Sequence, residues 1–398
     1  MLLRFGVSNY RSLCDYQEFS LVASKLKDRP THLIAVEKLS REVLPVIGIY
    51  GANASGKSNI LLAFSYMCQH ILNSHTMGLA TGGISRKPFQ LDPSFQKQPS
   101  HFDCDVVVSK VRYHYGFVID DDRVLEEWLY AYPSKHRQIW FYRQHDEAEI
   151  YFGKFLKGKN KTIAALTRDN CLFLSAAAQN NHEQLSQIYH YFRENYFFYF
   201  EINRMSETIS YLENEPLKAQ IVEFIKWADV GIVDAKIETG ERLENIQPLK
   251  PISFGHRDVN GNNVFFELND ESLGTSRLLI LLGPVFKALN QGKVIIIDEL
   301  DTSMHPLLSL KLLKLFSSSK SNHSGAQIIF TTHDTNLLCR NVLRRDQIWF
   351  TEKDKKGATG LYPLTDIRTN DSDKIEEGYL QGRFGAIPVL GKLDTLFE

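Results

Sequence analysis

The stretch GANASGKS, residues 51–58, decides the fold of this chain. It matches the pattern G-x-x-x-x-G-K-[ST] at every fixed position. The apolar run Val46–Tyr50 before it is typical of a strand buried on both faces, and the residues from Ser58 to about Leu72 have helical periodicity. A strand, the motif and a helix in this order predict a phosphate-binding loop.

The chemistry of this loop predicts ATP and Mg²⁺ as ligands. Backbone N–H groups of the loop and of the helix N-terminus converge on phosphates, and the glycines allow the backbone to approach closely. Lys57 is expected to reach the β- and γ-phosphates, and the Ser58 hydroxyl to bind Mg²⁺. A chance match in a chain of this length is on the order of one in a hundred. The predicted ATP-binding residues are Asn53, Ala54, Ser55, Gly56, Lys57, Ser58 and Asn59.

A second motif lies at the end of the apolar run Val294–Ile297, where Asp298 and Glu299 follow one another. Asp298 is placed to support the metal ion, commonly through water. Glu299 is placed beside the γ-phosphate, where it would orient or deprotonate the attacking water. Two acids at a strand end are common by themselves, and the upstream phosphate loop favours the catalytic interpretation.

Two later positions extend the predicted site. His333 follows the apolar run Gln327–Thr331, and a His at the mouth of a neighbouring parallel strand can donate to the γ-phosphate. Ser272 is a reasonable N-cap, and Gly274 allows close backbone approach. The segment around them is either a capped helix without a ligand or a second phosphate-binding helix end that completes another protomer's site.

The pattern along the chain predicts four regions. Period-two alternation before residue 150 predicts consecutive antiparallel strands, for example Phe102–Val108 and Tyr113–Ile119. Longer helical patterns follow, and after about residue 270 helices alternate with short apolar strands, which favours a parallel sheet. The predicted regions are an N-terminal lobe with the phosphate loop and antiparallel strands (1–150), a helical insertion acting as lid or partner-binding element (151–250), a C-terminal lobe (251–350) and a C-terminal segment (351–398).

Composition limits the function classes. The hydrophobic share of 43% and the charged share of 23% are those of a soluble globular protein, and a net charge of −1 gives no global basic field for nucleic acid. The five cysteines form no C-x-x-C pair, which favours a reducing compartment. No apolar run approaches the roughly 18 residues of a spanning helix. We expect a cytoplasmic protein without a membrane segment.

Several other patterns are better explained without a ligand. A hairpin turn is favoured over a metal site at Asp120–Asp122, and core packing over base stacking for the aromatic run near Tyr191. A nuclease interpretation of His256 with its neighbouring asparagines lacks a metal-ligand helix. For three arginines a phosphate or acidic partner and simple solvation stay equally open: Arg340, Arg344 and Arg345.

The order of these motifs resembles that of the ABC-class ATPases. The opening Phe5–Ser12 is similar to the N-terminal strand of the SMC, RecF and OLD-type branch. Closer still, the chain resembles the RloA-like ATPases of restriction and phage-defence loci. The stretches that carry this resemblance are Gly51–Asn59, Asn170–Ser175 with Ala178–Asn180, Glu271–Thr275, Asp298–Pro306 and Gly382–Pro388.

The resemblance implies an α/β fold: an ABC-type P-loop NTPase core with a mixed sheet, an antiparallel β subdomain and a helical insertion. It also implies a homodimer or higher homo-oligomer with ATP sandwiched between copies. In that arrangement Ser272, Gly274 and Thr275 form the signature that contacts the partner's nucleotide. The remaining roles that it implies are Asp301 in the D-loop, His333 as the switch histidine, Arg11 near the nucleotide and Gln90 as the best candidate for the metal-binding Q-loop residue.

One departure from the family pattern lies in the signature, and the spacing of the motifs separates this chain from another P-loop class. Leu273 lies between Ser272 and Gly274, so the second glycine of the transporter-type signature is replaced. The 241 residues from Lys57 to Asp298 (298 − 57) are too many for a simple AAA+ ring module and indicate an inserted domain, yet no long coiled coil is present.

The function expected from this resemblance is the sensor or regulator of an antiphage defence system, a dimeric ATPase that controls a separately encoded nuclease or toxin. The alternative is a DNA-binding ATPase of RecF or SMC type in repair or recombination. A third class is a nucleotide-gated scaffold that does not hydrolyse ATP. DNA-stimulated turnover would favour the second class, and co-purification with the product of a neighbouring gene would favour the first.

Overall fold

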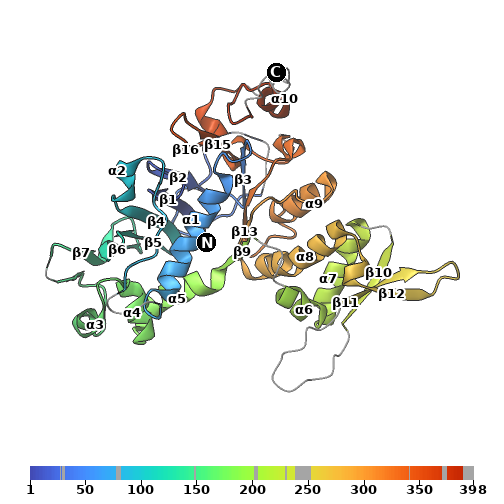
Figure 1. Cartoon of the computed structure of the whole chain (residues 1–398). Helices are drawn as coiled ribbons and strands as arrows, with labels where there is room; N and C mark the ends of the chain where they lie inside the picture. The colour runs from blue at the N-terminus through green and yellow to red at the C-terminus, as the bar shows by residue number, and fades with distance from the viewer. Residues whose placement is uncertain are drawn as a thin grey trace.

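The structure is a computed structural model of the 398-residue chain. It describes residues 1–26, 28, 32–77, 82–147, 149–200, 205–228, 231–237, 252–339, 341–369 and 374–388. These residues form helices and three sheets, of seven, six and three strands (Figure 1). The predicted α/β class is therefore confirmed, with a mixed core sheet and a separate antiparallel sheet.

The six-stranded sheet is the core and has the order β16-β15-β3-β14-β13-β9. Strands β15, β3, β14, β13 and β9 are mutually parallel. Only β16 runs antiparallel, and it pairs with β15. Because parallel strands end at one edge, the residues that follow β3, β13 and β14 meet there. The strand bounds are β3 Val46–Gly51, β9 Tyr196–Tyr199, β13 Val294–Ile297, β14 Gln327–Thr331, β15 Ile348–Lys353 and β16 Thr359–Pro363.

Both faces of the core sheet are covered, as its continuous apolar strands predict. Alternate residues of β13 and β14 point into opposite cores: Ile296 and Ile329 join the cluster around α1, and Ile297 and Phe330 join the other. Helix α1 (Lys57–Asn73) covers the first face. The helices of the second face are α6 (Met205–Leu212), α7 (Glu215–Ala228), α8 (Leu273–Gln291) and α9 (Pro306–Phe316).

Helix α8 has the boundary signals that its sequence predicts. Ser272 is its N-cap, and its hydroxyl accepts a hydrogen bond from the Thr275 N–H at 3.1 Å. Gly292 ends the helix in the left-handed region, at φ 66°. The helix leads directly into β13, so the signature at its start and the carboxylates after β13 belong to one continuous unit.

The seven-stranded sheet is antiparallel and has the order β2-β1-β4-β5-β6-β7-β8. One of its faces packs into the same core as α1 and the small helices of residues 160–195. The strand bounds are β1 Leu2–Ser8, β2 Gln17–Ser20, β4 Ser100–Val108, β5 Val111–Ile119, β6 Val124–Tyr132, β7 Gln138–Gln144 and β8 Tyr151–Phe152; the helices are α3 Asn160–Leu166, α4 Phe173–Gln179 and α5 Glu183–Asn195, with the short α2 at Pro93–Gln96.

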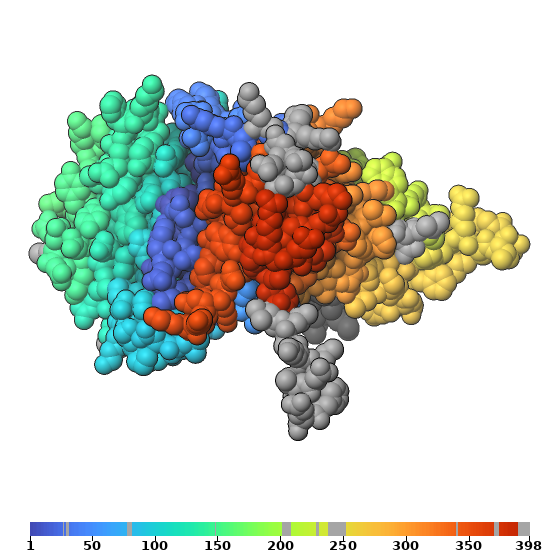
Figure 2. Space-filling view, turned by 90° about the horizontal axis from the view of Figure 1, so that it is seen from above, coloured from blue at the N-terminus to red at the C-terminus, as the bar shows by residue number. Residues whose placement is uncertain are grey.

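The third sheet projects from the body beside α7 and ends in the β11–β12 hairpin (Figures 1 and 2). Its strands are β10 (Ile232–Ile237), β11 (Ile252–Arg257) and β12 (Asn263–Glu267). The short turn η1 (Leu268–Asp270) joins β12 to the cap of α8. The hairpin is therefore adjacent in sequence to the signature.

The range 151–250, expected to be a helical insertion, is divided between both halves of the molecule. Helices α3, α4 and α5 pack with the antiparallel sheet, while α6, α7 and β10 belong to the second core. Between them β9 adds an edge strand to the core sheet. The aromatic run near Tyr191 is largely buried, in line with the core-packing interpretation. Residues 201–204, 229–230 and 238–250 of this range lie outside the described residues.

The C-terminal region begins within the core sheet, because β15 crosses the expected boundary at residue 350 and β16 follows it. Helix α10 (Ile375–Leu380) and the turn after it pack on β15 through Phe384, stacked on Phe350 at 6.1 Å. Arg344 pairs with Asp346 and Arg345 with Asp28, so both arginines hold the fold together. Arg340 lies outside the described residues. No helix in the described part of the chain is both long and apolar enough to cross a membrane.

Candidate functional site

The phosphate loop joins β3 to α1 in a conformation that its glycines make possible. Gly56, the N-cap of α1, has φ 108°, and a Cβ at this position would lie 2.1 Å from Thr359 Oγ1. Any larger residue would therefore be strained and would collide with β16. Inside the loop, Lys57 Nζ donates to the carbonyl oxygens of Gly51 at 2.9 Å and Ala52 at 3.1 Å.

The loop is braced by strands from the C-terminal region. Ser55 Oγ lies 2.6 Å from Thr351 Oγ1 in β15, and Thr359 Oγ1 in β16 donates to the Ser55 carbonyl at 2.8 Å. Ser12 Oγ accepts from Asn59 Nδ2 at 2.7 Å and lies 2.8 Å from Thr359 Oγ1. Asn59 thus contributes to the site by fixing the loop against the N-terminal segment.

Asp298 lies beside the start of α1, as the motif order predicts. Its Oδ1 accepts hydrogen bonds from Ser58 Oγ at 3.1 Å and from Thr331 Oγ1 at 2.5 Å. Its backbone N–H donates to the Tyr199 carbonyl of β9 at 3.0 Å. The structure therefore brings together the serine and the aspartate that the sequence assigned to the metal.

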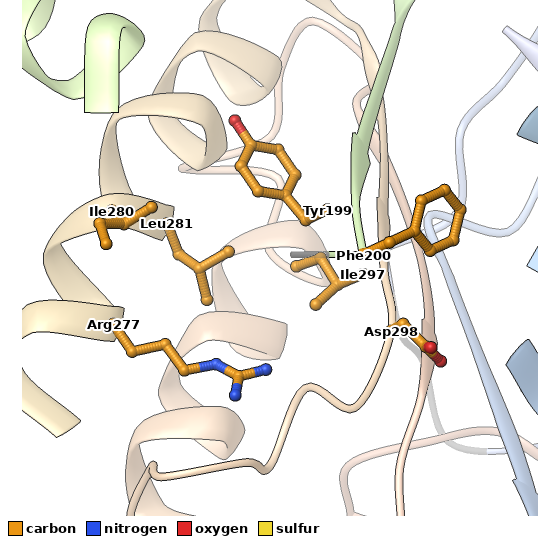
Figure 3. Close-up of a pocket in the computed structure, with 7 residues that line it drawn as sticks. All are labelled: Tyr199, Phe200, Arg277, Ile280, Leu281, Ile297 and Asp298. Carbon is orange, nitrogen blue, oxygen red and sulfur yellow. The ribbon is translucent and has the colours of Figure 1, made fainter. Parts of the chain in front are cut away.

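Glu299 turns away from the strand direction in the left-handed region, at φ 52°. Its backbone N–H donates to Thr331 Oγ1 at 2.7 Å, and its carbonyl accepts from Arg277 Nη2 of α8 at 2.8 Å. Its carboxylate is exposed and accepts from Thr302 Oγ1 at 3.0 Å. In Figure 3 the Arg277 side chain extends from α8 toward the end of β13, and Asp298 lies beyond it.

Asp301 connects the segment after β13 to the segment after β14. Its Oδ1 accepts from Thr332 Oγ1 at 2.6 Å and from the His333 N–H at 3.2 Å. His333 is thereby held at the same edge of the sheet as the two carboxylates. The predicted D-loop aspartate and the predicted switch histidine are in direct contact.

The charged groups at this edge act on one another. Burial lowers the pKa of Lys57, while the carboxylates of Asp298, Glu299 and Asp301 raise it. Burial and the charge of Lys57 lower the pKa of His333, and the same three carboxylates oppose that shift. Five side chains predicted from separate motifs thus form one electrostatic unit.

The signature residues lie at the exposed start of α8. Ser272 is exposed, and the Leu273 side chain is 69% exposed. A Cβ at Gly274 would lie 2.6 Å from the Ser303 carbonyl oxygen, so the glycine allows α8 to approach the segment that contains Asp301. Thr275 is buried and caps the turn with Ser272.

Arg11 and Gln90 line a groove of about 470 Å³, and Ser12, which contacts Asn59, lines it as well. Arg11 has φ 51°, and its N–H donates to the Lys87 carbonyl at 2.6 Å. Gln90 Nε2 donates to the Pro88 carbonyl at 3.2 Å. The structure therefore places Gln90 beside Arg11, whereas Ser58 and Asp298 are not among the residues lining this groove.

Sequence reasoning missed four residues of the site: Thr331, Arg277, Thr351 and Thr359. For Thr331 the sequence offered only its place at the end of the apolar run Gln327–Thr331, and its position beside Asp298 follows from the parallel pairing of β13 and β14, with Ile297 opposite Phe330. Arg277 lies one turn into the predicted helix after Ser272 and gave no signal. Thr351 and Thr359 reach the loop only through the tertiary fold.

The donor set at this edge suits magnesium. Mg²⁺ prefers oxygen ligands and is usually held by one or two carboxylates, substrate phosphates and water. Ser58 Oγ and Asp298 Oδ1 are oxygen donors 3.1 Å apart at the mouth of the phosphate loop. Within the described residues no group of three or more His, Cys, Asp or Glu side chains could hold a metal ion. These residues fit a metal that is held in part by phosphate oxygens.

Comparison with known proteins gives a family and a structural relative. A family model described as "AAA domain, putative AbiEii toxin, Type IV TA system" matches residues 46–339, from β3 to just beyond His333. Among solved structures the chain is similar to the Smc head domain with an extended coiled coil, bound to the C-terminal domain of ScpA, from Pyrococcus furiosus. That similarity has 13% identity and a TM-score of 0.37, over 92% of this chain and 99% of the other.

A search of curated proteins found no match to this chain. The predicted P-loop ATPase class is confirmed by the family model, and the closer resemblance to RloA-like ATPases stays a prediction. Because the model spans 294 of 398 residues (339 − 46 + 1), with the phosphate loop, both carboxylates and His333 among them, this chain belongs to the P-loop ATPase family described as "AAA domain, putative AbiEii toxin, Type IV TA system".

Proposed function

We propose that this chain binds ATP with Mg²⁺ at the loop of residues 51–58, hydrolyses it, and acts as a dimeric conformational switch. The observation that carries the proposal is the hydrogen bond between Ser58 Oγ and Asp298 Oδ1, 3.1 Å long. It joins two residues 240 positions apart that have the chemistry of a nucleotide-bound magnesium site. Family membership supports the same assignment.

Nucleotide binding would change the partners of Lys57. The ammonium group now donates to two carbonyl oxygens of its own loop. Phosphate oxygens carry full charge and accept stronger hydrogen bonds than neutral carbonyls. Ser58 and Asp298 would hold the magnesium ion, which supplies positive charge at the phosphate oxygens.

Hydrolysis would use the exposed carboxylate of Glu299. Glu299 accepts the proton of the attacking water, or orients it, and His333 donates to the γ-phosphate. The Asp301 contact keeps the His333 backbone near this site through a 3.2 Å hydrogen bond. When the γ-phosphate leaves, His333 loses its partner.

The dimeric part of the proposal rests on the exposed start of α8. Ser272 and Leu273 face solvent at a capped helix N-terminus, where backbone N–H groups and the helix dipole favour an anion. In the proposed dimer this end contacts the nucleotide held by a second copy. Two ATP molecules then clamp the dimer, and hydrolysis releases it.

The finer role that we propose is regulation of a separately encoded effector, a nuclease or toxin, in antiphage defence. The family description names a putative toxin of a type IV toxin–antitoxin system, and this supports a place in a toxin-linked locus. Within the described residues the ATP site is the one catalytic arrangement that the chemistry of the side chains supports. The resemblance to RloA-like ATPases supplies the rest.

Substitution of Glu299 by glutamine tests the mechanism. Glutamine keeps the shape of the side chain and cannot act as a base, so we expect ATP turnover to fall by roughly 10²–10⁴-fold. ATP binding with Mg²⁺ should persist, and the dimer should accumulate. Turnover is measured by phosphate release, and the dimer by light scattering with and without ATP.

Equal turnover by the wild type and by Glu299→Gln would overturn the mechanism. If ATP drives assembly and the variant leaves the lifetime of the dimer unchanged, the scaffold without hydrolysis is correct instead. Stimulation of turnover by DNA, weakened strongly by salt, would favour the RecF- or SMC-like alternative.

A further inference from the structure

Glu299 has a backbone conformation that is costly for a glutamate. A non-glycine residue at φ 52° costs on the order of 1–3 kcal/mol and persists only when the surrounding structure imposes it. The neighbouring Asp298 carries no such positive φ. The turn after Asp298 aims the Glu299 side chain outward, where it is exposed. Whatever imposes this turn also sets the direction of the proposed catalytic carboxylate.

Thr331 holds the N–H side of Glu299. The hydroxyl accepts from the Glu299 N–H at 2.7 Å, so its own single proton is free to donate, and it donates to Asp298 Oδ1 at 2.5 Å. The Thr331 carbonyl accepts from the Leu300 N–H at 2.9 Å. One fully buried residue thus fixes the backbone on both sides of Glu299 and the rotamer of Asp298.

Arg277 holds the carbonyl side of Glu299. Its guanidinium donates to the Glu299 carbonyl at 2.8 Å from the second turn of α8. Arginine presents its donors in a planar fork, so the bond constrains direction as well as distance. The guanidinium is half-buried; burial lowers its pKa, and the carboxylates of Glu299, Asp301 and Asp298 oppose that shift.

We propose that Thr331 and Arg277 are positioning residues that clamp the Glu299 peptide from β14 and α8 and so aim its carboxylate for ATP hydrolysis. This inference rests on the proposed function and adds two residues to it. Neither residue touches the reacting atoms. Their effect is therefore expected on the rate of the chemical step and not on the affinity for ATP.

Thr331→Val tests the first half of the clamp. Valine has nearly the shape of threonine and lacks the hydroxyl, so Glu299 loses its N–H partner and Asp298 loses a donor. We expect kcat to fall by roughly 10–100-fold, as for misplaced catalytic groups, with KM for ATP changed by less than about 3-fold. Thr331→Ser keeps the hydroxyl and should retain most of the rate.

A matched control separates this effect from general loss of a buried hydroxyl. Thr208 in α6 is also fully buried, and its Oγ1 donates to the Leu279 and Ile280 carbonyls of α8, away from the carboxylates. Thr208→Val removes the same kind of bond from the same region. Its kcat should stay within about 2-fold of the wild type, because surface or structural changes without contact to the site leave the chemical step intact.

Arg277→Gln tests the second half. Glutamine keeps one amide donor without the charge or the fork, so we expect a fall in kcat of roughly 3- to 30-fold and little change in KM. Arg277→Lys should give an intermediate rate. Lys287→Gln removes a cation from the same helix, beyond the reach of Glu299, where it lies over the Phe197 ring at 5.2 Å, and should match the wild type.

A crystal structure of Thr331→Val gives a readout that does not depend on activity: Glu299 should leave the left-handed region. Unchanged kcat in both Thr331→Val and Arg277→Gln, or Glu299 still at positive φ in that crystal, would overturn the clamp. Absence of turnover in the wild type would overturn the proposed function instead, and the crystal would then decide the clamp alone. If Thr331→Val does not fold, Thr331→Ala against Thr331→Ser makes the same comparison.

Discussion

At the residue scale, Lys57 combines hydrogen bonds to its own loop with opposing effects on its pKa. Its ammonium is satisfied by the carbonyl oxygens of Gly51 and Ala52, and burial lowers its pKa while three carboxylates raise it. The Lys57 ammonium thus lies near the three carboxylates of the proposed nucleotide site. Its contact with phosphates stays a prediction from the sequence, and the fold adds the three carboxylates that oppose the effect of burial on its pKa.

The buried histidine His70 predicts that the stability of the fold depends on pH. His70 of α1 stacks on Tyr66 at 5.7 Å, and burial lowers its pKa from 6.5 to about 4. Its Nε2 is buried without a hydrogen-bond partner among the described residues. Because the unfolded chain binds the proton more tightly than the folded one, stability falls as the pH drops from about 6.5 toward 4.

Substitution His70→Phe should remove this pH dependence. At about 1.4 kcal/mol per pKa unit, the wild type should lose up to about 3 kcal/mol between pH 7 and pH 4 through His70 alone. Phenylalanine suits the Tyr66 and Phe117 neighbours and cannot titrate. Urea unfolding of both proteins at pH 7, 5.5 and 4.5 measures the difference.

The wild type should lose stability relative to His70→Phe as the pH falls, since the variant lacks a group that the unfolded chain protonates. If the stability of the wild type and of His70→Phe changed with pH in the same way, the lowered pKa of His70 would not be the cause of the loss in acid. Unfolding at pH 7 serves as the reference for packing differences between the two side chains.

At the scale of elements, Ser272 combines a structural and a proposed functional role. Its hydroxyl caps α8 through the Thr275 N–H, a bond worth about 1 kcal/mol. The same position is expected to meet phosphate on a second copy. An alanine substitution would confuse the two effects, because it removes the cap and the contact together.

Substitutions that keep the cap separate the two roles. Asn and Asp cap helices as well as Ser does, so Ser272→Asn and Ser272→Asp should stay within about 0.5 kcal/mol of the wild type, and Ser272→Ala should lose about 1 kcal/mol. Only Ser272→Asp adds a negative charge that repels phosphate. In the Glu299→Gln background it should abolish the ATP-dependent dimer, measured by light scattering.

The asparagine variant is the control for charge, and it should dimerise at least partly. A dimer of Ser272→Asp that forms with ATP as readily as the parent would contradict a phosphate contact at this helix end. Thermal unfolding without nucleotide checks that all three variants keep their fold.

Elements with strong boundary signals were predictable, and short ones were not. The helix that the N-cap Ser272 predicts is found as α8, Leu273–Gln291, because the cap, the apolar period and Gly292 all agree. By contrast β9 is four aromatic residues that follow α5 without a turn signal. Its strand state comes from pairing with β13, which lies almost 100 positions later in the chain.

At the scale of the molecule, one side chain joins the antiparallel sheet to the core sheet. Gln327, the first residue of β14, accepts from the Leu2 N–H at 2.8 Å and donates to the Leu2 carbonyl at 2.9 Å. Both residues are fully buried. The bidentate amide thus fixes β1 against the sheet that carries the site.

Gln327→Leu should destabilise the whole molecule. It leaves the Leu2 N–H and carbonyl without their partner, at roughly 1–3 kcal/mol for each buried group, or about 2–6 kcal/mol together. Urea unfolding followed by tryptophan fluorescence and by circular dichroism measures the loss. Trp128 and Trp140 lie in β6 and β7 of the antiparallel sheet and Trp349 lies in β15 of the core sheet, so the fluorescence follows both sheets.

Gln187→Leu is the matched control, because Gln187 is exposed on α5 and its change should stay within about 0.5 kcal/mol. If Gln327→Leu were as stable as the control, Gln327 would not hold β1 against the core sheet.

The sequence by itself determined the phosphate loop, the carboxylate pair after β13, His333 and the capped start of α8, because each depends on a local pattern of a few neighbouring residues. Only the tertiary structure decided the residues that hold these parts together: Thr331, Arg277, Thr351 and Thr359. Their contacts join segments far apart in the chain. Parallel pairing and helix packing set such contacts, and no local periodicity records them.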